Sequence, residues 1–75
     1  MGQTIFEVIP VDGAWLVRIP GDSVAELQPT KSEAIERVRF LAERFDDWRA
    51  RVYGANGALE AELVPPGTPP ESRRT

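Results

Sequence analysis

The dipeptide Asp12-Gly13 constrains the fold of this chain more than any other feature. It separates Thr4–Val11 from Ala14–Ile19, two runs rich in β-branched and aromatic residues. A two-residue hairpin loop of type I′ needs positive φ at both positions, and Asp-Gly meets that requirement. Such a loop sets Glu7 directly across from Arg18, and this opposite-charge pair supports the register. The other predicted pairs are Val11 with Ala14, Pro10 with Trp15, Ile9 with Leu16, Val8 with Val17, and Phe6 with Ile19.

A second hairpin is predicted at Asn56-Gly57, which lies between Trp48–Gly54 and Ala58–Val64. Counting outward from a two-residue loop again brings opposite charges together across the strands, at Arg51 and Glu62. The other predicted pairs are Tyr53 with Glu60, Val52 with Ala61, and Ala50 with Leu63.

The segment between the hairpins is predicted to hold a short strand and a helix. Pro20-Gly21 has the composition of a turn, and it leads to a strand predicted over Val24–Gln28. A helix follows from Thr30 to Phe45, and it begins with a capping box in which Thr30 and Glu33 each satisfy a free backbone N–H group. Its apolar side chains form a stripe about 100° wide, as expected of a helix that packs through one face. The stripe consists of Ala34, Ile35, Val38, Leu41, Ala42 and Phe45.

The predicted order of elements is therefore β-β-β-α-β-β. This order indicates an α+β two-layer sandwich, with a mostly antiparallel sheet and one helix on one face. Residues 1–64 are predicted to form a single domain. Residues 65–75 hold four prolines and no large apolar side chain, so they are predicted to be a disordered tail. These patterns leave the order of the strands in the sheet open.

The composition favours a soluble, cytoplasmic protein. The N-terminus lacks the basic start and long apolar run of a signal peptide, and no stretch approaches the ~20 apolar residues of a membrane span. Cysteine is absent, as is common in cytosolic proteins. The net charge is −3, and the tail carries two arginines and one glutamate, so residues 1–64 carry −4. An acidic body is poorly suited to binding phosphates.

The inventory of reactive side chains argues against an enzyme. A chain with neither histidine nor cysteine has no Ser-His triad, no thiol nucleophile and no ordinary zinc site. The Gly54–Gly57 segment lacks the Gly-Lys-Ser/Thr ending of a phosphate loop. The acidic cluster of Glu43, Asp46 and Asp47 is interpreted as a solvated loop rather than a metal site. We therefore expect no catalytic residue, no metal and no cofactor.

Three strings of the sequence, VIPVDGAWLVRI, PTKSEAIERVRFLAERF and VYGANGAL, resemble a known family. It is a family of small bacterial proteins of unknown function, with a V-x-P-x-x-G-x-W-x-V strand pair, a T-K-x-E-A-I helix start and a G-x-x-G hairpin. The resemblance implies the fold and supplies no activity, because the matching residues are turn glycines, a core tryptophan and a helix cap. Family members usually have a polar residue in place of Phe40. The matching residues are Pro10, Gly13, Trp15, Val17, Thr30, Lys31, Glu33, Ala34, Ile35, Gly54 and Gly57.

A weaker resemblance, over Ala14 to Val38, is to the arm-type DNA-binding domains of phage integrases. Those domains lay a three-stranded sheet against DNA, so the resemblance implies an alternative function as a nucleic-acid-binding module. The residues that would serve it on the open sheet face are Arg18, Arg49, Arg51 and Tyr53. The predicted registers set three glutamates beside the three arginines on this face, which would make it neutral. The three are Glu7, Glu60 and Glu62. We therefore expect no nucleic-acid binding.

The function that remains is a small protein-interaction module, and two surfaces are candidates for it. The sheet face away from the helix is predicted to expose clustered aliphatic side chains, which suggest a protein interface. They are Ile5, Ile9, Val11 and Leu16. On the outer helix face, Phe40 points away from the apolar side chains of the helix, with Arg37 and Arg44 one turn away on the same side. Arginine stems beside an aromatic ring are typical of a contact rim. We expect a homodimer, or a complex with another protein, through one of these surfaces.

Overall fold

The computed structural model describes residues 3–23 and 25–65. It confirms the predicted α+β class and the order β-β-β-α-β-β. The elements are β1 (Thr4–Val11), β2 (Ala14–Arg18), β3 (Ala25–Gln28), α1 (Lys31–Ala42), β4 (Trp48–Tyr53) and β5 (Leu59–Leu63). The predicted disordered tail of residues 65–75 lies outside the described residues except for Pro65.

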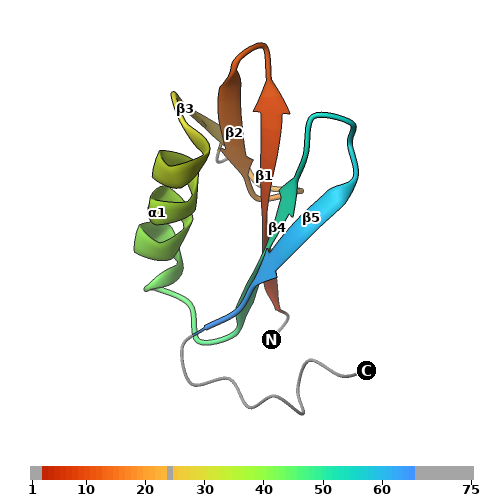
Figure 1. Cartoon of the computed structure of the whole chain (residues 1–75). Coiled ribbons are helices and arrows are strands. Elements are labelled where there is room, and N and C mark those ends of the chain that lie inside the picture. Colours follow the sequence, from red (N-terminus) through yellow and green to blue (C-terminus); the bar gives the residue numbers. More distant parts are fainter. Residues whose placement is uncertain (1–2, 24, 66–75) are drawn as a thin grey trace.

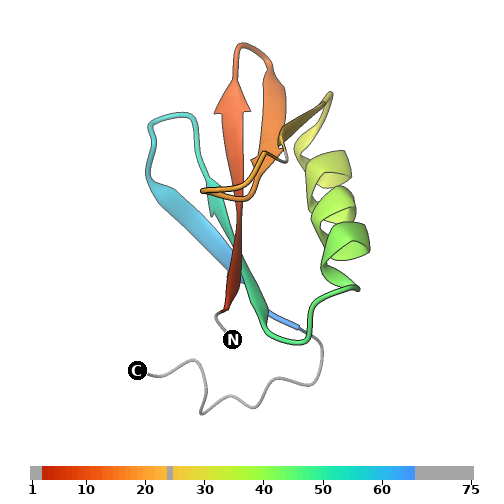
Figure 2. The same ribbon diagram turned by 180° about the vertical axis from the view of Figure 1, so that it is seen from behind.

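The five strands form one sheet in the order β3-β2-β1-β4-β5, and α1 lies on one side of it (Figure 1). The neighbours β1 and β4 are parallel, whereas the other three pairs are antiparallel. Parallel neighbours need a long crossover connection, and here β2, β3 and α1 together make it. Seen from behind, the second face of the sheet carries no helix or strand of the described residues (Figure 2). We call it the open face.

The first hairpin has the predicted turn and register. Asp12 and Gly13 have φ angles of 48° and 82°, as a type I′ turn requires. The five predicted pairs from Val11–Ala14 to Glu7–Arg18 are all present. The predicted pair of Phe6 with Ile19 is wrong, because β2 ends at Arg18. The Ile19 carbonyl instead accepts a hydrogen bond of 3.0 Å from the backbone N–H of Asp22, which closes the turn centred on Pro20-Gly21.

The second hairpin departs from its prediction at the loop. Gly54 and Ala58 are joined by a backbone hydrogen bond of 2.9 Å, so three residues rather than two form the connection. Gly57 takes a φ of 83° at the end of this loop, as three-residue loops commonly require. The ladder has a separate β-bulge between Val52 and Tyr53, where Glu60 is the extra residue. Tyr53 therefore pairs with Leu59, and the predicted pair of Tyr53 with Glu60 is wrong. Beyond the bulge, the three other predicted pairs of this hairpin are confirmed.

The helix begins as predicted and ends earlier. The Thr30 hydroxyl accepts a hydrogen bond of 3.1 Å from the backbone N–H of Glu33, which is the Thr30 half of the predicted capping box. At the other end, successive backbone bonds of the i to i+3 type follow Ala42 and tighten the chain out of the helix. Phe45 is therefore not part of the helical stripe. It is 38% exposed, and its ring meets Phe6 edge-on at 6.0 Å.

The core lies between α1 and the sheet, where the predicted apolar stripe of the helix meets the sheet. Trp48 is 5% exposed and packs edge-on against Phe6, as expected of a core anchor. Trp15 is only half-buried, with the Lys31 ammonium 5.8 Å from its ring. The buried apolar residues are Phe6, Val8, Val17, Ala34, Val38, Ala42, Trp48, Ala50 and Val52.

Candidate functional site

A row of apolar side chains crosses the open face, with one residue from each of the five strands. The register pairs Leu27 with Leu16, Leu16 with Ile9, and Tyr53 with Leu59. Ile9 and Tyr53 complete the row, because they follow Val8 and Val52, which pair in the parallel ladder. We call these residues the apolar stripe: Leu27, Leu16, Ile9, Tyr53 and Leu59.

The apolar stripe is accessible along its whole length. Its ends are the most exposed, at 62% for Leu27 and 54% for Leu59, while its three central residues are half-buried by their neighbours. Large aliphatic side chains that share one uncovered face are typical of an interaction surface, whereas single exposed ones are not. Because the five side chains are neighbours on one face, the row indicates an interaction surface.

A charged row runs beside the apolar stripe, two residues from it on β2, β1 and β4. Its members follow strand order and alternate in sign: Arg18 on β2, Glu7 on β1, Arg51 on β4 and Glu62 on β5. On β5 the extra residue of the bulge separates Glu62 from Leu59 by three positions. Two ion pairs within the row join Arg18 to Glu7 at 2.8 Å and Arg51 to Glu62 at 4.0 Å. Arg49 adds a third pair to Glu62, at 3.8 Å.

The structure brings together most of the residues predicted for a sheet interface. Ile9 and Leu16 are central in the apolar stripe, and Val11 lies beyond it at 38% exposed. Ile5 is half-buried on the same face, opposite Arg49.

Two residues of the stripe were missed by sequence reasoning. The predicted two-residue loop places Leu59 on the helix side, whereas in the structure Leu59 pairs with Tyr53 and lies on the open face. Leu27 was not assigned to either face, although its pairing with Leu16 follows once β3 is placed beside β2. A glycine as the third residue was the available signal for a three-residue loop, which pairs Tyr53 with Leu59.

The bulge on β5 moves Glu60 off the open face. Its carboxylate accepts a hydrogen bond of 3.0 Å from Lys31, at the start of α1. The predicted neutral balance is therefore wrong, because three arginines now face two glutamates among the described strand residues. All three arginines of this face form ion pairs with Glu7 or Glu62. Tyr53, the fourth residue of the nucleic-acid alternative, belongs to the apolar stripe.

The outer helix face has a different geometry from the one predicted. Phe40 is 56% exposed, as expected, and the Arg37 guanidinium lies 5.1 Å from the centre of its ring. Arg37 is also held by Glu26 of β3 through two hydrogen bonds of 2.7 and 3.0 Å. Hydrogen bonding to Arg37 lowers the pKa of the Glu26 carboxyl, against the smaller opposing effect of burial. Phe40 thus covers an arginine of its own chain.

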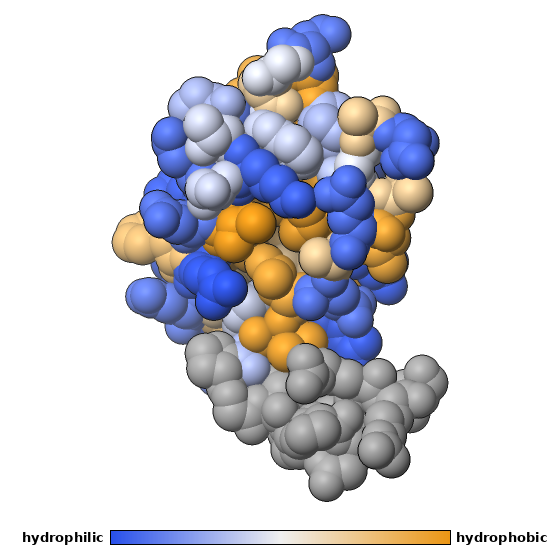
Figure 3. Space-filling view, viewed as in Figure 1, coloured by the Kyte–Doolittle hydropathy of each residue, from blue (hydrophilic) through white to orange (hydrophobic). Residues whose placement is uncertain are grey.

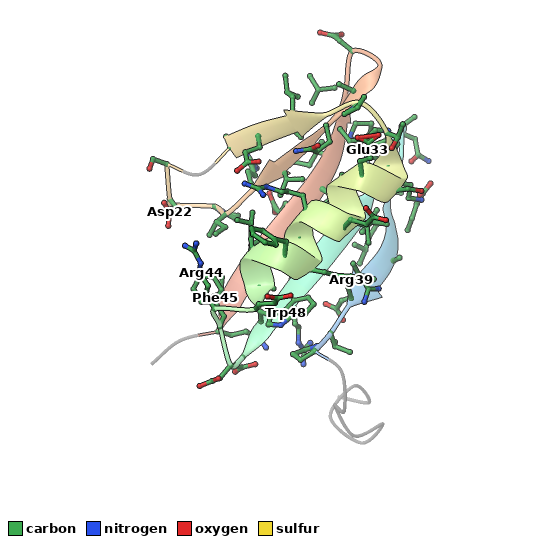
Figure 4. The ribbon with its side chains drawn as sticks, turned by 90° about the vertical axis from the view of Figure 1, so that its left-hand side faces the viewer. Asp22, Glu33, Arg39, Arg44, Phe45 and Trp48 are labelled. Carbon is green, nitrogen blue, oxygen red and sulfur yellow. The ribbon has the colours of Figure 1, made fainter. Side chains whose placement is uncertain are left out.

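Arg44 does not join this pair. It lies on the flank of the molecule near Asp22 and Phe45 (Figure 4), and with them it lines a hollow of about 120 Å³. The predicted trio on the outer helix face is therefore reduced to Arg37 and Phe40.

A larger hollow, of about 420 Å³, lies at the end of α1. Trp48, Phe45 and Pro65 contribute its apolar lining, and Glu43 and Asp46 are among its polar residues. Figure 3 shows apolar surface between α1 and β5 that runs down towards this end of the molecule. It arises because α1 packs on β2, β3 and β1, away from β5.

Residues 3–23 and 25–65 hold neither a metal cluster nor a membrane span. No group of three or more Asp or Glu side chains in these residues is placed to hold a metal ion. No helix in that part of the chain is long and apolar enough to cross a membrane.

The fold and surface define a class of protein: a small α+β sandwich with one helix, an uncovered sheet face and an apolar stripe across it. Within that class, residues 6–62 match the family described as an uncharacterized protein conserved in bacteria, DUF2188. The match covers most of the chain, so the protein belongs to this family, as the motifs predicted. No curated protein and no solved structure matches the chain.

Proposed function

We propose that this protein is a small, non-enzymatic interaction module that self-associates through its open face. The observation that carries the proposal is the apolar stripe, which spans all five strands with no described element covering it. Association would remove this surface from water, at roughly 25 cal/mol for each Å² of apolar area. A domain this small also has a limited core, so self-association is a natural supplement to its stability.

The apolar stripe is favoured over the outer helix face because the exposed side chains of the helix face already have contacts within the chain. Phe40 already stacks with Arg37, and Arg37 is already paired with Glu26. These contacts within the chain account for an aromatic side chain at this place without a second protein. Leu27 and Leu59 have no comparable intramolecular cover at their exposed ends. The open face also has the composition of an interface, with an apolar centre and charges at its side.

Two matched variants test the proposal. Leu59→Glu and Phe40→Glu place the same charge at residues of nearly equal exposure, 54% and 56%, on different surfaces. We expect the parent to be dimeric by light scattering at concentrations between about 10 µM and 1 mM, which correspond to a weak dimer with a Kd in the same range. Leu59→Glu should weaken the dimer by about tenfold or more, since it buries an unpaired charge, whereas Phe40→Glu should leave it unchanged. Circular dichroism should show both variants folded.

Two results would count against the open face. A parent that stays monomeric up to about 1 mM, where the binding free energy would be weaker than about −4 kcal/mol, would sink self-association altogether. Loss of the dimer in Phe40→Glu with retention in Leu59→Glu would move the interface to the outer helix face.

A further inference from the structure

We infer that the charged row determines how two copies of this chain pair. The inference rests on the proposed self-association and adds its geometry: the open faces meet with β1 of one copy over β4 of the other, and β2 over β5. In this arrangement Arg18 faces Glu62 of the second copy, and Glu7 faces Arg51 of the second copy. The charged row would then be the specificity determinant of the interface.

The symmetry of a dimer limits the arrangements to be compared. A homodimer is usually related by a two-fold axis, so the same surface must be complementary to itself. When two sheets pack face to face, their strands are aligned within about 30°. The two-fold axis therefore runs either nearly along the strands or nearly across them.

An axis along the strands reverses the order of the strands and leaves each row facing its own counterpart. The charged row reads positive, negative, positive, negative from β2 to β5. Reversal about the line between β1 and β4 therefore places every charge opposite one of the other sign. The four residues make four intermolecular contacts in the dimer, two of each kind.

An axis across the strands gives the opposite result. Each strand then lies over its own copy, so a charged row on the axis would set Arg18 against Arg18 and Glu7 against Glu7. Like charges placed together across an interface cost several kcal/mol. With the axis on the apolar stripe, the charged row would instead face Val11 and Ala14, and its charges would be buried against apolar groups.

The apolar stripe fits the favoured axis equally well. The reversal that pairs β1 with β4 places Ile9 over Tyr53 and Leu16 over Leu59 of the second copy. The strand β3 has no counterpart under this reversal, so Leu27 lies at the rim of the contact. Leu27→Glu should therefore weaken the dimer less than Leu59→Glu does.

Charge reversal in separate chains tests the pairing. Arg18→Glu and Glu62→Arg change side chains that are 48% and 34% exposed, so both variants are expected to fold. Each alone sets two like-charged pairs across its homodimer and should raise the dimer Kd by about a hundredfold or more. In an equimolar mixture the two substituted side chains face each other with their charges exchanged, and the other pair keeps its parental form. The Kd of the mixture, measured by anisotropy of one labelled chain, should return to within about threefold of the parent, because both pairs are again opposite in sign.

A second mixture is the control. Arg18→Glu with Glu7→Arg changes two residues that are partners within one chain, at 2.8 Å. Under the proposed pairing this mixture still contains like-charged contacts across the interface, so its Kd should stay raised. Recovery here and not with Glu62→Arg would overturn the pairing of β1 with β4 and favour an axis between β1 and β2. If the Kd stays raised in both mixtures while the parent is dimeric, the proposed charge pairing is refuted and self-association still stands.

Discussion

At the residue scale, Gly54 leaves room for the Glu60 side chain, which packs against it. Gly54 is buried, and a β-carbon at this residue would collide with the Glu60 carboxylate. The same carboxylate pairs with Lys31 at 3.0 Å, and Lys31 lies over the Trp15 ring. The second hairpin is thereby connected to the start of α1 through a contact that needs a glycine beneath it.

Gly54→Ala should displace Glu60 and break its pair with Lys31. The pair is exposed and contributes little, so the variant should lose only about 1 kcal/mol of unfolding free energy. Urea unfolding of the parent, Gly54→Ala, Glu60→Ala and the double variant checks the cause. The unfolding free energy lost through Gly54→Ala should be less than half as large when Glu60 is already alanine. An equal loss in both backgrounds would mean that Glu60 is not the obstacle.

At the scale of elements, one ion pair ties α1 to the edge of the sheet. Glu26 lies on β3, the last strand on that side, and receives two hydrogen bonds from Arg37 of α1. The strand is only four residues long and has a neighbour on one side alone, so it depends on such contacts. The pair also holds Arg37 beneath Phe40.

Glu26→Gln should destabilise the protein in a pH-dependent way. Its carboxyl has a lower pKa in the folded protein than the ordinary value of 4.5, because Arg37 hydrogen-bonds the charged form. The stabilisation is therefore present above about pH 4.5 and is lost as the pH falls through the lowered folded value. Since both side chains are about a third exposed, we expect only about 0.5–1 kcal/mol.

Thermal unfolding at pH 7 and pH 3 measures this difference. The midpoint of Glu26→Gln should fall below that of the parent at pH 7 and approach it at pH 3. Glu36→Gln, at an exposed residue of α1, serves as the control and should show no such convergence. A gap between Glu26→Gln and the parent that is as wide at pH 3 as at pH 7 would contradict an electrostatic origin.

At the scale of the whole molecule, the distribution of charge argues against a nucleic-acid partner. The chain carries a net charge of −3, and the three arginines of the open face form ion pairs with glutamates on that same face. Binding to a phosphate backbone depends on releasing counterions through unneutralised positive charge. The apolar stripe offers Tyr53 as its one aromatic ring, whereas single-strand binders stack several bases on aromatic side chains.

We therefore expect no micromolar binding to duplex DNA or to single strands at about 0.15 M salt. An electrophoretic mobility shift assay with labelled duplex and single-stranded oligonucleotides tests this. Tight binding that weakens steeply as salt is raised would overturn the expectation. The double variant Arg49→Glu and Arg51→Glu should then abolish the shift, which would assign the binding to the open face.

The sequence by itself determined the features that depend on neighbouring residues. The Asp12-Gly13 turn, the Thr30 cap and the helical stripe follow from dihedral preferences and hydrogen bonds within a few residues. Because side chains alternate along a strand, the hairpin register alone was enough to assign Ile9 and Leu16 to an uncovered face.

Only the tertiary structure decided which strands are neighbours and therefore what the candidate site is. The parallel pairing of β1 with β4 brings Tyr53 beside Ile9 and sets Arg51 beside Glu7. These residues are far apart in the chain, and no local preference relates them, since such pairing depends on how α1 and the crossover pack. The pairing of Leu59 with Tyr53 then brought Leu59 into the stripe, and the bulge at Glu60 took a charge off the face. Sequence reasoning placed Ile9, Leu16 and Tyr53 on uncovered faces of two separate hairpins, and long-range packing joined them with Leu27 and Leu59 into one row.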